Sequence, residues 1–271
     1  PSLVCNIAIG ASTVPTQRVL GNLFYRGLRF HRPVFIGDTL TTQTKVLALR
    51  QNTIKPGRAA SGMVGLEIHT VNQKGETVLL FWRCPMVPCR DSDANTGHAD
   101  DLSVMPEVIS KKDVFASIPD WNYSVLPVEA IDFNPGEVID VEARDTVTMA
   151  PELVRMSLNM AMTHTDVSRS VYDKRLVYGG HTISMAASQL ARILPSLAMI
   201  VCWYKCDHVA PVFEEDILSS RIHVKEVNDV AGGRLIKLAI DVFAERVDTS
   251  GGTQSNIRVL DWQLAVMTGP K

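Results

Sequence analysis

The stretch RPVFIGDTLTTQTKV, Arg32–Val46, decides the fold because it recurs later in the chain as APVFEEDILSSRIHV, Ala210–Val224. Proline, valine, phenylalanine, aspartate and leucine stand at matching places in the two copies, with one constant offset between them. Each copy begins with turn residues and continues with alternating apolar and polar residues, which is typical of a half-buried β-strand. The repeat therefore predicts two related units in one chain.

Similar patterns flank both copies of the repeat. Upstream, small and apolar residues recur at intervals of three and four in Pro1–Pro15 and in His181–Leu194, which predicts a helix in each place. Downstream, alternating runs rich in β-branched and aromatic residues predict further strands. These runs are Ser61–Val71, Thr77–Pro85, Leu235–Val247 and Asn256–Met267. We therefore expect an α+β fold with two tandem antiparallel sheets, each wrapped around one central helix.

The boundary between the two units is expected near residue 103. The segment PCRDSDANTGHADDLS, Pro88–Ser103, is polar and lacks periodicity, so we interpret it as a linker or surface excursion. We place the N-terminal unit with its linker at residues 1–103 and the C-terminal unit at residues 104–271. Because the chain enters its first helical pattern almost at Pro1, we expect the N-terminal unit to lack its start.

Composition excludes several function classes. The 271 residues carry a formal net charge of −2, which gives no electrostatic footprint for nucleic acid or an anionic membrane. The longest apolar run, Leu194–Tyr204, is too short to span a bilayer and contains a proline. The five cysteines are Cys5, Cys84, Cys89, Cys202 and Cys206. They lack CxxC spacing, and no HExxH or GxGxxG motif occurs, so we predict reduced thiols, no metal and no cofactor.

The C-terminal unit contains a segment without a counterpart in the N-terminal unit. We predict a strand around Val138–Val147, then a short helix capped by Thr148 with Pro151 in its first turn. The helix leads into NMAMTHTD, Asn159–Asp166, and we predict one site per chain because this stretch occurs once. The methionines of this region are interpreted as core filler; they are Met149, Met156, Met160 and Met162.

Two glycines precede the second helical pattern, in RLVYGGHTISMAASQLARIL, Arg175–Leu194. Gly179 and Gly180 offer no side chain to cap a helix. A glycine does allow another group to approach the exposed backbone N–H groups, where the helix dipole favours negative charge. We therefore interpret this turn as the place where a polarised oxygen meets backbone donors.

These features together resemble a known family. The three motifs RLVYGGHTISMA, NxAxxHxD at Asn159–Asp166 and the paired PVFxxD openings resemble those of the MaoC-like double hotdog hydratases. Within that group, the chain most resembles the mesaconyl-CoA (2-methylfumaryl-CoA) hydratases and the related (R)-specific enoyl-CoA hydratases. The resemblance implies a double hotdog fold and a lyase that hydrates an enoyl-CoA-type thioester.

The chemistry of hydration suggests a role for each site residue. Adding water to an α,β-unsaturated thioester needs a base for the water, an acid for the α-carbon and donors for the thioester oxygen. His164 is the candidate acid and base, and the Gly180 N–H, beside Gly179, is the candidate donor. In the related (R)-specific hydratases, an aspartate stands five residues before the histidine; here it is Asn159, which orients water but takes no proton. Asp166 either orients His164 or acts as its partner acid or base.

Four further residues have two interpretations each. His181 either contacts substrate or satisfies a neighbouring carbonyl group, and Tyr178 packs rather than donating a proton. Arg175 binds a substrate carboxylate or a CoA phosphate, or else forms a surface pair. His208 either packs, as Phe30 does at the matching place in the N-terminal unit, or belongs to the site.

Two other functions are compatible with these residues. In a hotdog acyl-CoA thioesterase, His164 or Asp166 would direct water to the thioester carbonyl group. In a non-catalytic acyl-thioester binding protein, Asn159 would mark lost activity. For all three functions we expect an acyl-CoA thioester as partner, no nucleic acid and no membrane. We expect a cytoplasmic protein that is a monomer with a pseudo-dimeric fold, or a homodimer.

Overall fold

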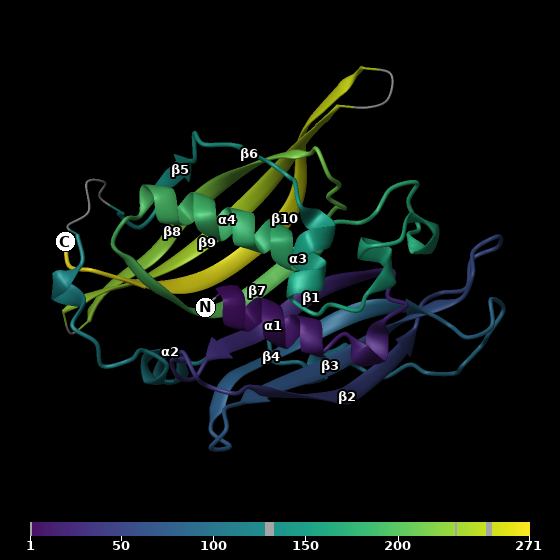
Figure 1. Ribbon diagram of the computed structural model, residues 1–271, viewed down its shortest axis with the longest axis horizontal. Helices are drawn as coiled ribbons and strands as arrows, with labels where there is room; N and C mark the ends of the chain where they lie inside the picture. The colour runs from purple at the N-terminus through teal and green to yellow at the C-terminus, as the bar shows by residue number, and fades with distance from the viewer. Residues whose placement is uncertain (1, 128–132, 231, 248–250) are drawn as a thin grey trace.

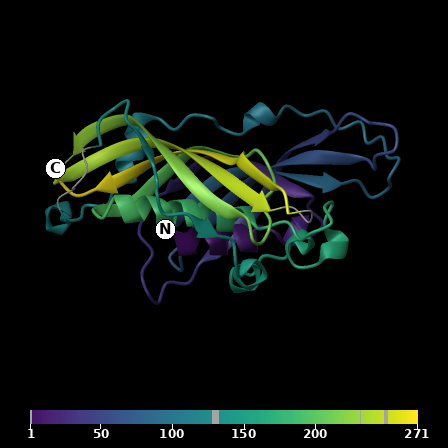
Figure 2. The ribbon, with the colours of Figure 1, turned by 90° about the horizontal axis from the view of Figure 1, so that it is seen from above.

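The computed structural model describes residues 2–127, 133–230, 232–247 and 251–271. Its ten β-strands form one continuous antiparallel sheet, and the two central helices lie against the same face of it (Figures 1 and 2). The expected two sheets are both present, but they are joined edge to edge by hydrogen bonds. No helix among the described residues is long and apolar enough to cross a membrane.

The two halves of the chain repeat the same order of elements. The N-terminal half contains α1 (Ser2–Ala11), β1 (Gly21–Phe30), β2 (Thr41–Gln51), β3 (Ser61–Val71) and β4 (Thr77–Pro88). The C-terminal half contains α4 (Gly179–Ile193), β7 (Leu197–His208), β8 (Ile217–Val230), β9 (Gly233–Val247) and β10 (Thr253–Thr268). In the strand order β2-β3-β4-β1-β7-β10-β9-β8, the strands of the two halves are arranged symmetrically about the β1–β7 pair, with β1 to β4 matching β7 to β10. We propose residue 103 as the boundary between the halves.

Strands β1 and β7 join the halves at the centre of the sheet. They pair antiparallel, with Tyr25 opposite Cys206 and Leu28 opposite Trp203. Buried side chains of both halves, such as Phe81 and Trp262, belong to one apolar core. The joint is therefore an interior part of the fold and not a surface between two separate domains.

Both central helices begin or end away from the predicted positions. α1 ends at Ala11 and is followed by the short helix η1 (Val14–Thr16), whereas the predicted helix continued to Pro15. α4 already begins at Gly179, so the two glycines form its first turn. Small residues let the sheet approach both helices closely, and Ala8 and Ala186 are each 1% exposed.

The connection between the halves runs along the molecule as short elements. They are η2 (Leu102–Val104), α2 (Lys111–Ala116), η3 (Tyr123–Val125), β5 (Val138–Asp140), β6 (Asp145–Thr146), α3 (Ala150–Met156), η4 (Met162–His164) and η5 (Val167–Arg169). The predicted strand at 138–147 is two short strands, and both pair with β8. The predicted linker pairs with β2, since Gln51 N donates to His98 O at 2.9 Å.

Two local predictions around α3 are wrong. Met149, with a φ of 56°, is the residue before the first turn, and Thr148 does not cap the helix. The methionines do not fill the core. The short helix α3 buries Ala150 and Val154, and Met156 at its end is exposed. Met149, Met156 and Met160 are 66%, 73% and 46% exposed, and Met162 is half-buried.

Candidate active site

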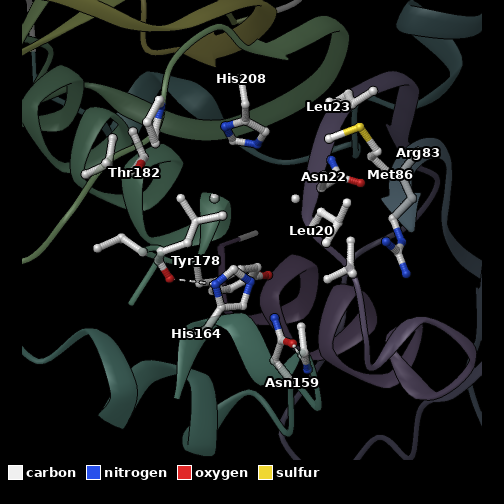
Figure 3. Close-up of a pocket in the computed structure, with 18 of the residues that line it drawn as sticks. Leu20, Asn22, Leu23, Arg83, Met86, Asn159, His164, Tyr178, Thr182 and His208 are labelled. Carbon is white, nitrogen blue, oxygen red and sulfur yellow. Dashed lines mark hydrogen bonds between the residues drawn. The ribbon is translucent and has the colours of Figure 1, made fainter. Parts of the chain in front are cut away.

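A cavity of about 270 Å³ lies at the joint between the halves (Figure 3). It is bounded by the start of β1, the end of β7, the start of α4 and the segment that carries His164. Both halves supply polar groups to its lining: Asn22, Arg83, Asn159, His164, Thr182 and His208. The cavity therefore exists only because the two units are paired.

The segment Ser157–His164, here called the histidine loop, rests on the end of α1. Met160 N donates a hydrogen bond to Thr13 Oγ1 at 2.8 Å. Gly10 of α1 lies so close to the carbonyl oxygen of Ser157 that a Cβ atom there would overlap it. The histidine loop thus belongs to the C-terminal half in sequence and is supported by the N-terminal half in space.

His164 is held in the neutral form that accepts a proton. Its Nδ1 lies 2.7 Å from the carbonyl oxygen of Leu176, which only accepts, so Nδ1 carries the proton and Nε2 keeps a lone pair. Burial lowers the pKa of His164 to about 4, against the opposing effect of the Leu176 hydrogen bond. At neutral pH the ring is therefore uncharged, with Nε2 available in the cavity.

Asn159 presents donors to the cavity. It is 8% exposed, and its Oδ1 accepts a hydrogen bond from Ala161 N at 2.9 Å. Because the oxygen is already used, the amide Nδ2 is the group left for a ligand or water. Asn159 therefore complements His164 as a hydrogen-bond donor beside a base.

The start of α4 has no capping side chain. Tyr178, the residue before the first turn, makes no side-chain cap hydrogen bond, and within the described ranges no acceptor meets the N–H of Gly179 or Gly180. Gly179 lines the cavity, whereas Gly180, the predicted donor, lies outside its lining. A Cβ atom at Gly179 would lie 2.5 Å from His208 Nε2, and one at Gly180 would lie 2.5 Å from Asn6 Oδ1. Both glycines are thus required by close packing, and Gly179 offers its backbone to the cavity.

Besides Gly180, three predicted site residues lie outside the cavity lining: Asp166, Arg175 and His181. The predicted pairing of Asp166 with His164 is not found, because Leu176 O is the partner of Nδ1. Asp166 is exposed and accepts hydrogen bonds from the side chain and backbone of Ser168, which lower its pKa. Arg175 pairs with Glu214, and His181 lies in a shallow groove between α3 and α4, where burial lowers its pKa.

Arg83 is a cavity residue that the sequence interpretation missed. Its side chain is 2% exposed, and Nη2 donates to Ser12 O at 2.7 Å and to Thr16 Oγ1 at 3.0 Å. Burial lowers its pKa, and no carboxylate among the described residues offsets that effect. A signal was present in the sequence, because Arg83 is the one charged residue in the apolar run Val78–Val87.

Two further groups leave buried polar atoms without partners. Tyr178 lies with its ring 5.7 Å from the His164 ring, and its hydroxyl group has no hydrogen-bond partner within the described residues. The same holds for Nε2 of His208. In the part of the chain that the structure describes, no cluster of three or more possible ligands could hold a metal, and all five cysteines are free thiols.

Comparison with known proteins identifies the family. No family model matches the chain. A conserved Mycobacterium tuberculosis protein described as having a double hotdog fold is 41% identical, with a TM-score of 0.85 over 98% of this chain and 81% of that chain. A MaoC domain protein dehydratase from Chloroflexus aurantiacus is 25% identical, with a TM-score of 0.77 over 100% of this chain and 82% of that chain. The chain belongs to the double hotdog proteins.

The double hotdog name describes the two halves seen here, each a sheet around one helix. A curated relative is the mesaconyl-CoA hydratase of Cereibacter sphaeroides, which is 32% identical over 234 residues. The match covers 81% of this chain and 65% of that hydratase, so the chain spans less than two thirds of its relative's length. In this double hotdog protein, the cavity with His164 lies at the joint between the hotdog units.

Proposed function

We propose that this double hotdog protein is a hydro-lyase that adds or removes water across the double bond of an enoyl-CoA-type thioester. One observation carries the proposal: a neutral histidine with a free Nε2 shares a cavity with an uncapped helix start. A base and a set of backbone donors are the two elements that this reaction requires. The resemblance to a mesaconyl-CoA hydratase supports the same chemistry.

The proposed reaction uses the side chains of His164 and Asn159, the Gly179 N–H and a water molecule. His164 Nε2 takes a proton from water while the water oxygen bonds to the β-carbon. The electron pair of the double bond moves toward the thioester, whose oxygen gains enolate charge beside the Gly179 N–H. The imidazolium of His164 then returns its proton to the α-carbon, so that H and OH have been added and His164 is neutral again. Asn159 Nδ2 holds the water by a hydrogen bond.

Arg83 supports an acyl group that carries a second carboxylate. A buried cation without an acidic partner is unfavourable, and a substrate carboxylate would supply the missing charge. The cavity volume of about 270 Å³ suits a short acyl group, with the rest of CoA outside. Mesaconyl-CoA, named in the relative, has such an acyl group. We therefore propose a short, carboxylated enoyl thioester as the substrate class.

A spectroscopic assay with mesaconyl-CoA and crotonyl-CoA, each with a thiol reagent present, tests the activity. Loss of the enoyl absorbance without free thiol means hydration, whereas release of free CoA would mean a thioesterase. Saturable binding without either change would mean a binding protein. The proposed substrate class predicts that mesaconyl-CoA is preferred and that Arg83→Gln reduces this preference relative to crotonyl-CoA.

Substitution of His164 tests the assignment of the base. Loss of a general acid–base group lowers turnover by about a hundred- to ten-thousand-fold. His164→Ala should do so while thioester binding largely survives. Asp166→Ala is the matched control, since Asp166 is exposed and bonded to Ser168, and it should turn over nearly as wild type. The reverse pattern would move the base from His164 to Asp166.

The proposal also covers the oligomeric state, the location and the partners of the protein. The pairing of β1 with β7 supports a chain that serves as its own pseudo-dimer, as a monomer or within a homodimer. The free cysteines support a cytoplasmic protein, and the balanced charge supports neither nucleic acid nor membrane as partner. Sedimentation analysis of the purified chain measures the oligomeric state.

A further inference from the structure

A second histidine lines the cavity opposite His164. His208 is the last residue of β7, and Figure 3 shows its ring on the far side of the cavity from the His164 ring. Its Nε2 is buried, and no described residue gives it a hydrogen-bond partner. A buried imidazole nitrogen without a partner in a ligand cavity calls for an explanation, because buried polar atoms are normally hydrogen-bonded.

The ring of His208 lies directly against the start of α4. A Cβ atom on Gly179 would be 2.5 Å from both Cε1 and Nε2 of His208. The ring also packs edge-on against Tyr25, with 5.9 Å between ring centroids. His208 is thus adjacent to the uncapped backbone of Gly179, where the thioester oxygen is proposed to bind. Burial lowers its pKa to about 4, so the ring is neutral at physiological pH and has one N–H.

The N-terminal half shows that packing alone does not require an imidazole here. Phe30 ends β1 at the place that matches His208, and it is 6% exposed within the apolar core. A phenyl ring therefore fits this position of the fold. The histidine stands only on the side of the joint where the strand end faces the cavity.

We propose that His208 donates a hydrogen bond from its neutral ring to the thioester oxygen, and so forms a two-donor oxyanion site with the Gly179 N–H. The inference rests on the proposed hydration reaction and extends it. No proton is transferred by His208; its N–H is aimed at the oxygen that gains charge as water adds to the β-carbon. A donor of this kind stabilises the transition state more than the substrate.

Two variants separate a donor from a packing residue, with mesaconyl-CoA as substrate. His208→Phe keeps an aromatic ring, as Phe30 does in the other half, but removes the N–H. Loss of one oxyanion donor lowers kcat by about a hundred- to a thousand-fold. We expect that loss in His208→Phe with KM changed little, and partial recovery in His208→Gln, whose amide still donates. Wild-type kcat in His208→Phe would overturn the inference, and His223→Gln on the sheet surface is the control for loss of a histidine.

Infrared spectroscopy of bound substrate measures the same hydrogen bond directly. The probe is mesaconyl-CoA labelled with ¹³C at the thioester carbonyl, bound to the His164→Ala variant. The carbonyl stretching frequency should rise when His208→Phe is added, because the oxygen loses a donor. An unchanged frequency contradicts the role of His208 alone. Normal turnover by His164→Ala contradicts the proposed function, and with it the basis of this inference.

Discussion

The two PVFxxD turns have the same hydrogen bonds and very different surroundings. Phe35 N donates to Asp38 Oδ2 at 2.8 Å in the N-terminal half, and Phe213 N donates to Asp216 Oδ2 at 2.9 Å in the C-terminal half. Yet Phe35 is 66% exposed and Phe213 is 8% exposed. The turn is thus formed by its own residues, whereas its burial depends on what lies over it.

The cover in the C-terminal half comes from residues near the site. Arg246 pairs with Asp216 at 2.6 Å and lies 4.6 Å from the centre of the Phe213 ring. Tyr172, which lines the cavity, contacts the same ring from another side, with 5.3 Å between ring centroids. The difference between the turns teaches that duplication supplied the framework and that the segment around the histidine loop made one copy part of a site.

Among the substitutions that test this difference between the halves, Gly10→Ala should lower stability and activity most. A methyl group there overlaps the Ser157 carbonyl oxygen, so the histidine loop must leave α1. We expect a loss of about 3 kcal/mol in the free energy of unfolding, together with loss of activity. Ser188→Ala, at the matching place in α4, is the control: Ser188 is exposed and should tolerate the change. Urea unfolding of both variants measures the contrast, and equal midpoints would refute it.

Asp216→Asn should have the second-largest effect on the free energy of unfolding. The carboxylate is 1% exposed and pairs with Arg246, whose side chain is 17% exposed, so its removal leaves a largely buried cation uncompensated. We expect a loss of about 2–3 kcal/mol in the free energy of unfolding, below the full effect for a completely buried pair. Asp38→Asn should leave the urea midpoint close to that of the wild type. If both substitutions destabilise alike, burial is not what distinguishes the turns.

Acidification should reveal a smaller difference in stability between the two halves. The pKa of His208 is lowered by burial from 6.5 to about 4, so its contribution to stability is complete above pH 6.5 and is lost as the pH falls toward 4. Between pH 7 and pH 5, His208→Phe should remove on the order of 1 kcal/mol from the pH-dependent loss. His31→Gln should remove less, because His31 in the N-terminal half is more exposed to solvent although its pKa is also about 4. Urea midpoints at the two pH values test the order, and a larger effect of His31 would reverse it.

Ile36→Ser should have the smallest effect. Ile36 lies in the uncovered turn and is fully exposed, at 109% of its reference area. We expect an unfolding midpoint indistinguishable from wild type and unchanged turnover of mesaconyl-CoA. A clear loss of stability would mean that this turn, too, has a cover in solution.

Much of the fold was predictable from the sequence, because alternation in a strand records which face is buried. The strands after each PVFxxD copy were predicted in this way, and β1 and β7 were not. β1 has a register shift between Arg26 and Arg29 and a positive φ at Gly27, which interrupt the alternation. β7 is buried on both faces over much of its length, so its apolar run has no period.

The site was predictable where one local motif contains the residue. His164, Asn159 and Gly179, which line the cavity, were singled out as candidates in this way. The partner of His164 was not, because Leu176 O reaches Nδ1 only through the fold, while Asp166 is the closer group in sequence. Arg83 belongs to the other half and enters the cavity through the pairing of the units, which no local pattern records.

The β1–β7 joint also determines how the site exchanges with solvent. Where β1 and β7 pair with each other, over Phe24–Arg29 and Cys202–Asp207, each strand also has a second partner, since β1 pairs with β4 and β7 with β10. Amides in such a position take up deuterium only when the whole sheet opens, whereas amides of edge strands such as β2 exchange by local opening. The cavity lies just beyond this doubly paired stretch, at Gly21–Leu23 of β1 and His208 of β7. The joint beside the cavity should therefore exchange on the timescale of global unfolding, and the cavity walls faster, by local opening.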